Sequence, residues 1–130
     1  MIGVLVVSHS RKAAEGIGDI AREMGGDARI EAVGGDPDGG IGTSVDDIRD
    51  ALSRLADGTD GVVVLADLGS AVMNAEIAVE AADEDVECVV VDAPILEGAL
   101  NAAVAASSPN ASLETVERAA AEAAEHATGT

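Results

Sequence analysis

Four short apolar runs rich in β-branched residues recur along the chain. They are Ile2–Val7, Arg29–Val33, Gly61–Ala66 and Val86–Val91, each bordered by Gly, Asp or Ser. Runs of this length and composition predict β-strands. The near-continuous apolar stretches at 62–65 and 89–91 are typical of strands buried on both faces, which need not alternate with polar residues.

Helical periodicity occupies the segments between these strands. Apolar residues recur three and four positions apart in two stripes: Ala13, Ile17, Ile20, Ala21 and Met24, then Val45, Ile48, Leu52 and Leu55. Both stripes predict amphipathic helices. Three further helices are expected over Ala71–Ala82, Pro94–Ala106 and Leu113–His126. Pro94 suits a first helical turn, and Ser112 suits an N-cap.

Strands that alternate with helices are typical of βαβ units. Such units build a parallel sheet whose two faces are covered by right-handed crossovers. We therefore predict an α/β fold, with a doubly wound four-stranded parallel sheet of order 2-1-3-4 and about five helices. The 130 residues fit a single domain, 1–130.

Charge and aromatic content narrow the choice of partner. Seven Lys and Arg stand against 25 Asp and Glu, which gives a net charge of −18, and aromatic residues are absent. This composition excludes nucleic acid, because phosphates need cations and bases need stacking platforms. The acidic excess fits either an electronegative docking surface or a coat suited to a salty cytoplasm. Its even spread and the single lysine, Lys12, favour the coat and predict a haloarchaeal source.

The sequence predicts a cytoplasmic protein without membrane contact. No apolar stretch approaches the roughly 20 residues of a membrane span. Residues 1–7 lack the basic segment and cleavage site of a signal peptide. The single cysteine, Cys88, lies in an apolar run and is expected in the core, and the two histidines are far apart. We therefore expect neither a disulfide framework nor a metal centre.

Polar residues follow the first and third predicted strands. In open α/β sheets, ligands bind beyond the carboxyl ends of the strands, at the point where the strand order reverses. With the order 2-1-3-4, this point lies between strand 1, which ends in Ser8–Ser10, and strand 3, which ends in Asp67–Ser70. This topology places His9 beside Asp67.

A histidine beside an aspartate suggests a nucleophile. A carboxylate that accepts the Nδ1 proton fixes the imidazole tautomer and leaves Nε2 free to attack. A structural or surface histidine is the alternative, and the strand-end position together with Asp67 favours the nucleophile. The free backbone N–H groups at the start of a helix can donate hydrogen bonds to phosphoryl oxygens. Candidate phosphate-binding residues are Ser10, Thr43, Gly69 and Ser70. For Ser70, simple N-capping is an equal alternative.

Other motifs with known chemistry are absent from the sequence. It contains neither Gly-x-x-x-x-Gly-Lys-Ser/Thr nor a Gly-x-Gly-x-x-Gly after strand 1, so nucleotide binding by these loops is unsupported. It also lacks the Gly-x-Ser-x-Gly of α/β hydrolases. A receiver domain would carry an acidic pair where this chain has Ser-His-Ser.

Several motifs taken together resemble one family. They are Val-Ser-His-Ser at 7–10, Ala-Glu-Gly at 14–16, Asp-Pro at 36–37, Ile-Gly-Thr at 41–43, Asp-Leu-Gly-Ser-Ala at 67–71 and Ala-Pro-Ile-Leu-Glu-Gly at 93–98. In combination they resemble the mannose-type IIA family of the phosphoenolpyruvate phosphotransferase system, over essentially the whole chain. More narrowly, they resemble the phosphotransfer subunits of bacterial-type dihydroxyacetone kinases. Sugar-transporting members tend to carry Gly-Gly-Ser-Pro where this chain has Asp-Leu-Gly-Ser-Ala.

The resemblance implies a phosphorelay without a cofactor. It implies that His9 is phosphorylated on Nε2, that Asp67 orients it, and that the protein is a homodimer. The implied donor is the phosphocarrier HPr, expected as a separate protein because the chain ends after one domain. The implied acceptor is ADP on the nucleotide-binding subunit of dihydroxyacetone kinase. A IIA domain for sugar uptake and a docking or regulatory module that passes no phosphate are the alternatives.

Overall fold

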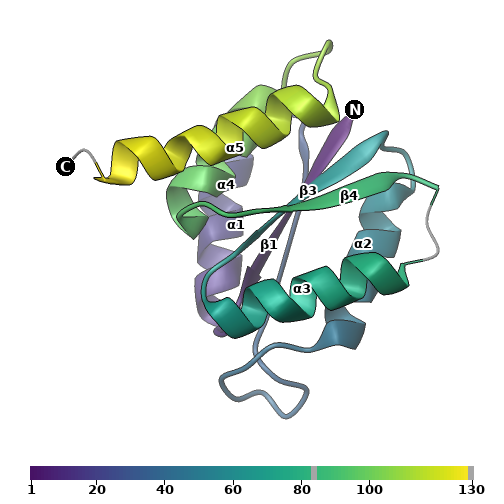
Figure 1. Ribbon diagram of the computed structural model, residues 1–130, viewed down its shortest axis with the longest axis vertical. Coiled ribbons are helices and arrows are strands. Elements are labelled where there is room, and N and C mark those ends of the chain that lie inside the picture. Colours follow the sequence, from purple (N-terminus) through teal and green to yellow (C-terminus); the bar gives the residue numbers. More distant parts are fainter. Residues whose placement is uncertain (83–84, 129–130) are drawn as a thin grey trace.

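A sheet of four strands with helices on both sides forms the protein (Figure 1). The computed structural model describes residues 1–82 and 85–128, with the side chains of the last helix given as far as Glu125. The strands are β1 (Ile2–Ser8), β2 (Arg29–Gly34), β3 (Gly61–Ala66) and β4 (Glu87–Val91). The helices are α1 (Arg11–Gly25), α2 (Val45–Ala56), α3 (Gly69–Ala81), α4 (Ile95–Ala106) and α5 (Leu113–Thr128).

The strand order confirms the predicted fold class. All neighbouring strands are parallel, and they lie in the order β2-β1-β3-β4. Near the carboxyl end of the central strand β1, Val7 pairs with Val33 of β2 and Ala66 of β3. The order therefore reverses between β1 and β3, where ligands of doubly wound sheets bind.

The core has one layer on each side of the sheet. Figure 1 shows α1, α4 and α5 on one face and α2 and α3 on the other. Val4 and Val63 pack with the first group of helices, whereas Leu5 and Val64 pack with the second. Both layers combine branched side chains from the strands with alanines from the helices, so the core is filled without aromatic residues.

The buried face of α1 differs from the predicted stripe. Small residues form this face: Ala14, Gly18, Ala21 and Gly25. Ile20 and Met24 of the predicted stripe are instead 47% and 55% exposed. The reason is close packing, because a Cβ on Gly25 would lie 3.0 Å from the Cβ of Ala103 in α4. A helix that approaches its neighbours this closely buries its small residues and leaves the large ones outside.

Some predicted element ends are shifted by one or two residues. α3 begins at Gly69 rather than Ala71, and Pro94 is the N-cap of α4 rather than a residue of its first turn. Ser112 caps α5 as predicted, since its Oγ accepts the N–H of Thr115 at 3.2 Å. Cys88 is only half-buried and packs against the α2 and α3 layer.

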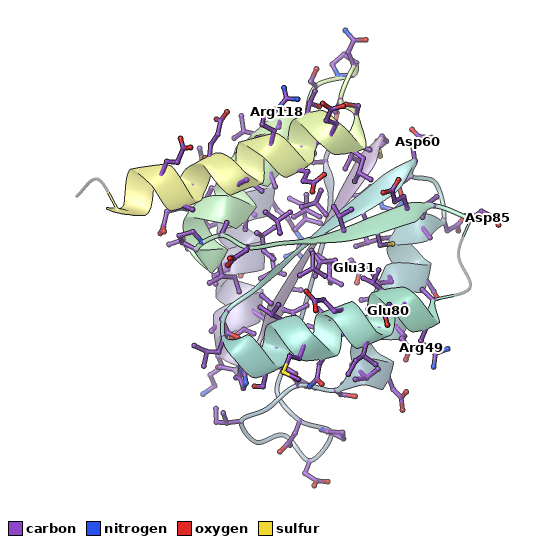
Figure 2. All side chains as sticks on the ribbon, in the orientation of Figure 1. Glu31, Arg49, Asp60, Glu80, Asp85 and Arg118 are labelled. Atoms are coloured by element: carbon purple, nitrogen blue, oxygen red, sulfur yellow. The ribbon has the colours of Figure 1, made fainter. Side chains whose placement is uncertain are left out.

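Charged side chains lie on the surface. Asp60, Glu80 and Asp85 carry exposed carboxylates, and Arg49 and Arg118 are also exposed (Figure 2).

Among the described residues, no helix has the length and apolar content required to span a bilayer.

The end of β2 passes very close to the start of α1. A Cβ on Gly34 would lie 2.6 Å from the carbonyl oxygen of Ser10 and 2.7 Å from that of Ser8. Both are backbone atoms, which cannot swing aside as a side chain would. The loop that follows Gly34 returns to the same place, where the N–H of Gly42 donates to the carbonyl of His9 at 2.8 Å. Glycine at position 34 therefore allows the loop to approach the end of β1.

We predict that Gly34→Ala destabilises the protein by about 1–3 kcal/mol, because the added methyl group must displace backbone. Gly16→Ala is the matched control, because Gly16 is exposed in the middle of α1 and has nothing within 4 Å of an added Cβ. This control should stabilise the helix by about 0.5–1 kcal/mol. Urea denaturation measures both changes. Equal effects of the two substitutions would contradict the steric explanation.

Candidate functional site

The candidate site lies at the reversal point of the sheet, where β1 and β3 end side by side. The N–H of Asp67 donates to the carbonyl of Val7 at 3.2 Å, so the contact between the two strands continues past their last paired residues. The chain then turns away into α1 after Ser10 and into α3 after Leu68. His9 and Asp67 therefore project from adjacent strand ends and meet.

The Asp67 carboxylate is held by four hydrogen bonds. Its Oδ1 lies 2.9 Å from Nδ1 of His9 and accepts the N–H of Leu68 at 2.8 Å. Its Oδ2 accepts the hydroxyl of Ser8 at 2.7 Å and the backbone N–H of His9 at 3.1 Å. Both oxygens are thus engaged, and the carboxylate plane is fixed with respect to the imidazole.

These contacts keep Asp67 ionised at neutral pH. Burial raises the pKa of the carboxyl, but hydrogen bonds from the His9 ring, the Ser8 hydroxyl and two backbone N–H groups together lower it below its usual value. An ionised carboxylate only accepts hydrogen bonds, so Nδ1 of His9 must carry the proton between the two groups. In the neutral imidazole, Nε2 then holds the free electron pair.

Nε2 of His9 faces the start of α3. The hydroxyl of Ser70 lies 2.6 Å from Nε2 and is exposed. The His9 side chain itself is 18% exposed, and that of Asp67 is 22% exposed. Asp67 therefore holds the ring at Nδ1, while Nε2, which has the free electron pair, contacts the exposed hydroxyl of Ser70.

The start of α3 also offers backbone donors near Nε2. Leu68 is the N-cap, and within the described residues no side chain caps this helix end. The first N–H groups of a helix, including those of Gly69 and Ser70, have no partner within the helix. The alternative role of Ser70 as an N-cap is wrong, because α3 begins one residue before it.

Ser10 and Thr43 are engaged elsewhere. Ser10 Oγ caps α1 by accepting the N–H of Ala13 at 3.2 Å. The hydroxyl of Thr43 accepts a hydrogen bond from the side-chain amide of Asn74 in α3 at 2.6 Å. This contact ties the glycine-rich loop between β2 and α2, residues 35–44, to α3. Among the described residues, the Thr43 hydroxyl makes no hydrogen bond to His9. The structure thus brings Ser70 into contact with His9, whereas Thr43 helps to hold its loop against α3.

Two residues of this region were not found from the sequence. Ser8 enters the sequence analysis as the end of a strand and as part of the Val-Ser-His-Ser motif, with no role of its own. A serine that ends a buried apolar strand requires a hydrogen-bond partner, and this was the available signal. Asn74 was one polar residue in a helix rich in alanine. Its position four residues after Ser70 indicates the same side of α3 and was the available signal.

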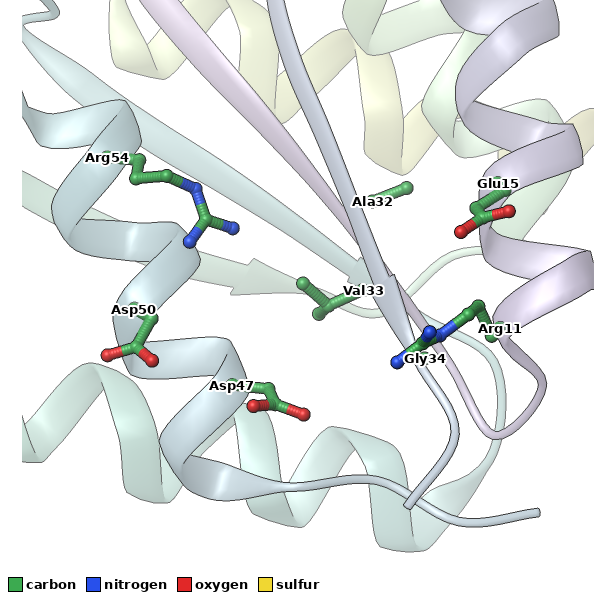
Figure 3. Close-up of a pocket in the computed structure, with 8 residues that line it drawn as sticks. All are labelled: Arg11, Glu15, Ala32, Val33, Gly34, Asp47, Asp50 and Arg54. Atoms are coloured by element: carbon green, nitrogen blue, oxygen red, sulfur yellow. The ribbon is translucent and has the colours of Figure 1, made fainter. Parts of the chain in front are cut away.

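A pocket of about 240 Å³ lies at the outer edge of β2 (Figure 3). Arg11 and Glu15 of α1 stand on one side of the strand, and three charged residues of α2 stand on the other. None of the candidate site residues lines this pocket. In the described part of the chain, no three His, Cys, Asp or Glu side chains gather as a metal ion would require.

Comparisons with known proteins find one family. The model of the EIIA-man family, described as "PTS system fructose IIA component", matches residues 3–117. The phosphoryl donor subunit DhaM of PEP-dependent dihydroxyacetone kinase 1 from Listeria innocua is 41% identical over 97 residues, which are 75% of each chain. DhaM of Escherichia coli is 37% identical over 114 residues, which are 83% of this chain and 24% of that one.

A solved structure agrees with this assignment at the level of the fold. The crystal structure of a protein of unknown function superposes with a TM-score of 0.83 and is 30% identical. The superposition covers 94% of both chains. The arrangement of strands and helices described above therefore recurs in an experimentally determined structure.

We predict that Asp67 stabilises the fold in a pH-dependent way. Its pKa in the folded protein lies below the usual value of 3.8. A carboxyl with a lowered folded pKa adds stability above its unfolded pKa, and this stability is lost as the pH falls through the folded value. The difference in unfolding free energy between the wild type and Asp67→Asn should therefore be largest above about pH 5 and shrink toward about pH 2. Urea denaturation at several pH values measures this difference. A difference that stays constant would contradict the prediction.

Proposed function

The chain belongs to the EIIA-man family of the phosphotransferase system, and on this premise we propose that it is a phosphoryl carrier of a dihydroxyacetone kinase. In this proposal, residues 1–130 act as one domain that carries the phosphoryl group on Nε2 of His9. The observation that carries the proposal is the arrangement of His9. Asp67 holds Nδ1 from one side at 2.9 Å, while Nε2 points to the surface.

The proposed transfer is a displacement between two imidazoles. The electron pair on Nε2 of His9 forms a bond to the phosphorus of a donor phosphohistidine. The bond between phosphorus and the donor nitrogen breaks, and its electron pair stays with the donor ring. The proton on Nδ1 remains in place, and the positive charge that develops on the His9 ring lies next to the Asp67 carboxylate. Phosphoryl transfer of this kind depends mainly on positioning and charge stabilisation.

The start of α3 is the proposed cradle for the phosphoryl oxygens. The Ser70 hydroxyl, 2.6 Å from Nε2, must move aside as the phosphorus arrives, and it can then donate to a phosphoryl oxygen. The N–H groups of Gly69 and Ser70 lie at the positive end of the helix dipole, where an anion is favoured. Ser10 and Thr43 support the site indirectly in this scheme. Ser10 caps α1, and Thr43 holds the glycine-rich loop against α3.

The proposed partners follow the relatives that are named phosphoryl donor subunits. We place HPr upstream as the donor and ADP on the nucleotide-binding subunit of the kinase downstream as the acceptor. The carrier works in the cytoplasm as a homodimer and requires no cofactor. Its acidic surface is proposed as an adaptation to high salt.

We predict that His9→Ala abolishes phosphorylation. Incubation with phosphoenolpyruvate, enzyme I and HPr at high salt should add one acid-labile phosphoryl group to the wild type, seen by intact-mass spectrometry. His126→Ala is the matched control, because it removes the second of the two histidines, and it should be phosphorylated normally. A phosphorylated His9→Ala protein would contradict the proposal.

We predict that Asp67→Asn keeps the fold but slows phosphoryl transfer at least roughly tenfold, because the amide no longer enforces the reactive tautomer. Stopped-time mass spectrometry gives the rate, and circular dichroism checks the fold. Transfer at the wild-type rate would show that Asp67 does not orient His9.

The acceptor is tested by adding the nucleotide-binding kinase subunit with ADP to the phosphorylated protein. Loss of the phosphoryl group from His9 with formation of ATP supports the kinase role. Retention under these conditions, with discharge to a IIB protein instead, would assign the chain to sugar uptake. A chain that binds kinase subunits but is never phosphorylated would be a docking module.

A further inference from the structure

Ser8 lies behind the proposed reactive pair and makes two hydrogen bonds there. It is the last residue of β1 and is only 2% exposed, one of the few buried polar residues of the described chain. Its hydroxyl donates to Oδ2 of Asp67 at 2.7 Å and accepts the backbone N–H of Ser10 at 3.1 Å. Ser8 therefore connects the start of α1 with the carboxylate that holds His9.

The direction of this chain of hydrogen bonds is fixed at one end. A backbone N–H can only donate, so the Ser8 oxygen must act as the acceptor for Ser10. The single proton of the hydroxyl is then available for Asp67, which accepts it on Oδ2. On the other side of the carboxylate, Oδ1 accepts from Nδ1 of His9. Ser10 thus donates to Ser8, and Ser8 and His9 both donate to the Asp67 carboxylate, which only accepts. The backbone N–H of Ser10 and the ionised carboxylate together fix the direction of each of these bonds.

We propose that Ser8 is a positioning residue, whose buried hydroxyl fixes the rotation of the Asp67 carboxylate and thereby keeps the proton of His9 on Nδ1. The terminal torsion of an aspartate is intrinsically soft and broadly distributed. Without the Ser8 hydroxyl, Oδ2 keeps only the His9 N–H at 3.1 Å, and the N–H of Ser10 loses the oxygen that accepts it. The consequence for transfer rests on the proposed function, whereas the consequence for the tautomer does not.

The first test measures the tautomer in the unphosphorylated protein. Nitrogen-15 NMR of the His9 ring, in protein with labelled histidine at a pH where the ring is neutral, distinguishes a protonated Nδ1 from a protonated Nε2. The wild type should show protonated Nδ1 only, and Ser8→Ala should show an admixture of the form protonated on Nε2. Ser8→Thr restores the hydroxyl and should restore the wild-type shifts.

Ser44→Ala is the matched structural control. Ser44 Oγ also accepts a backbone N–H at a helix start, that of Asp47 at 3.2 Å, and it caps α2. This variant should lose helix stability in urea denaturation but keep the wild-type nitrogen shifts. If the methyl group of Ser8→Thr prevents folding at this buried position, the comparison of Ser8→Ala with Ser44→Ala still decides the matter.

The second test measures phosphoryl transfer from phospho-HPr. Phosphoryl transfer to Ser8→Ala should be slower than transfer to the wild type by roughly three- to tenfold. This is less than the full loss of a hydrogen bond to a charged group would give. A folded Ser8→Ala protein with wild-type nitrogen shifts overturns the proposal. If the wild type accepts no phosphoryl group, the proposed function fails, but the nitrogen shifts still show whether Ser8 positions the pair.

Discussion

The hydrogen bonds of the Asp67 carboxylate are the interaction on which the rest of the site depends. Four donors from the ends of β1 and β3 converge on its two oxygens. They compensate the cost of burying the charge and leave it ionised. Because the carboxylate is ionised and fixed, the imidazole of His9 has one tautomer and one exposed nitrogen. The chemistry that we propose requires just these two properties.

The sheet supplies these contacts through its strand order. β1 and β3 are neighbours although α1, β2 and α2 lie between them in sequence, so a histidine and an aspartate 58 positions apart end on the same edge. Small residues then allow the surrounding elements to approach. Gly34 lets the loop after β2 reach the carbonyl of His9, Gly25 lets α1 lie close to α4, and Gly18 lets it lie close to β2. A core built without aromatic rings is compatible with such short separations.

Much of this arrangement could be predicted from the sequence. The apolar runs gave the strands, the alternation with helices gave the parallel sheet, and the strand order brought His9 and Asp67 together. Ala21 of the predicted α1 stripe is buried, but the expectation that Ile20 and Met24 lie inside was wrong. Close packing of Gly25 against Ala103 of α4 and of Gly18 against Ala32 of β2 places small residues on the buried face instead. The role of Ser70 could not be decided from sequence. It depends on the extended backbone of Leu68, with φ −127° and ψ 165°, which makes Leu68 the N-cap. The spacing of Asn74 from Ser70 indicates a shared side of α3, but the partners of Ser8 and Asn74, Asp67 and Thr43, follow only from the folded geometry.

The most direct test of the phosphoryl carrier is to determine which ring nitrogen is phosphorylated. The wild-type protein would be labelled with nitrogen-15 in its histidines, phosphorylated through enzyme I and HPr, and studied by long-range proton–nitrogen and phosphorus NMR. We expect phosphorus bound to Nε2 of His9, with Nδ1 still protonated against Asp67. Phosphorus on Nδ1, or on no nitrogen of His9 while the donor is active, would contradict the central claim that Asp67 holds one nitrogen so that the other can react.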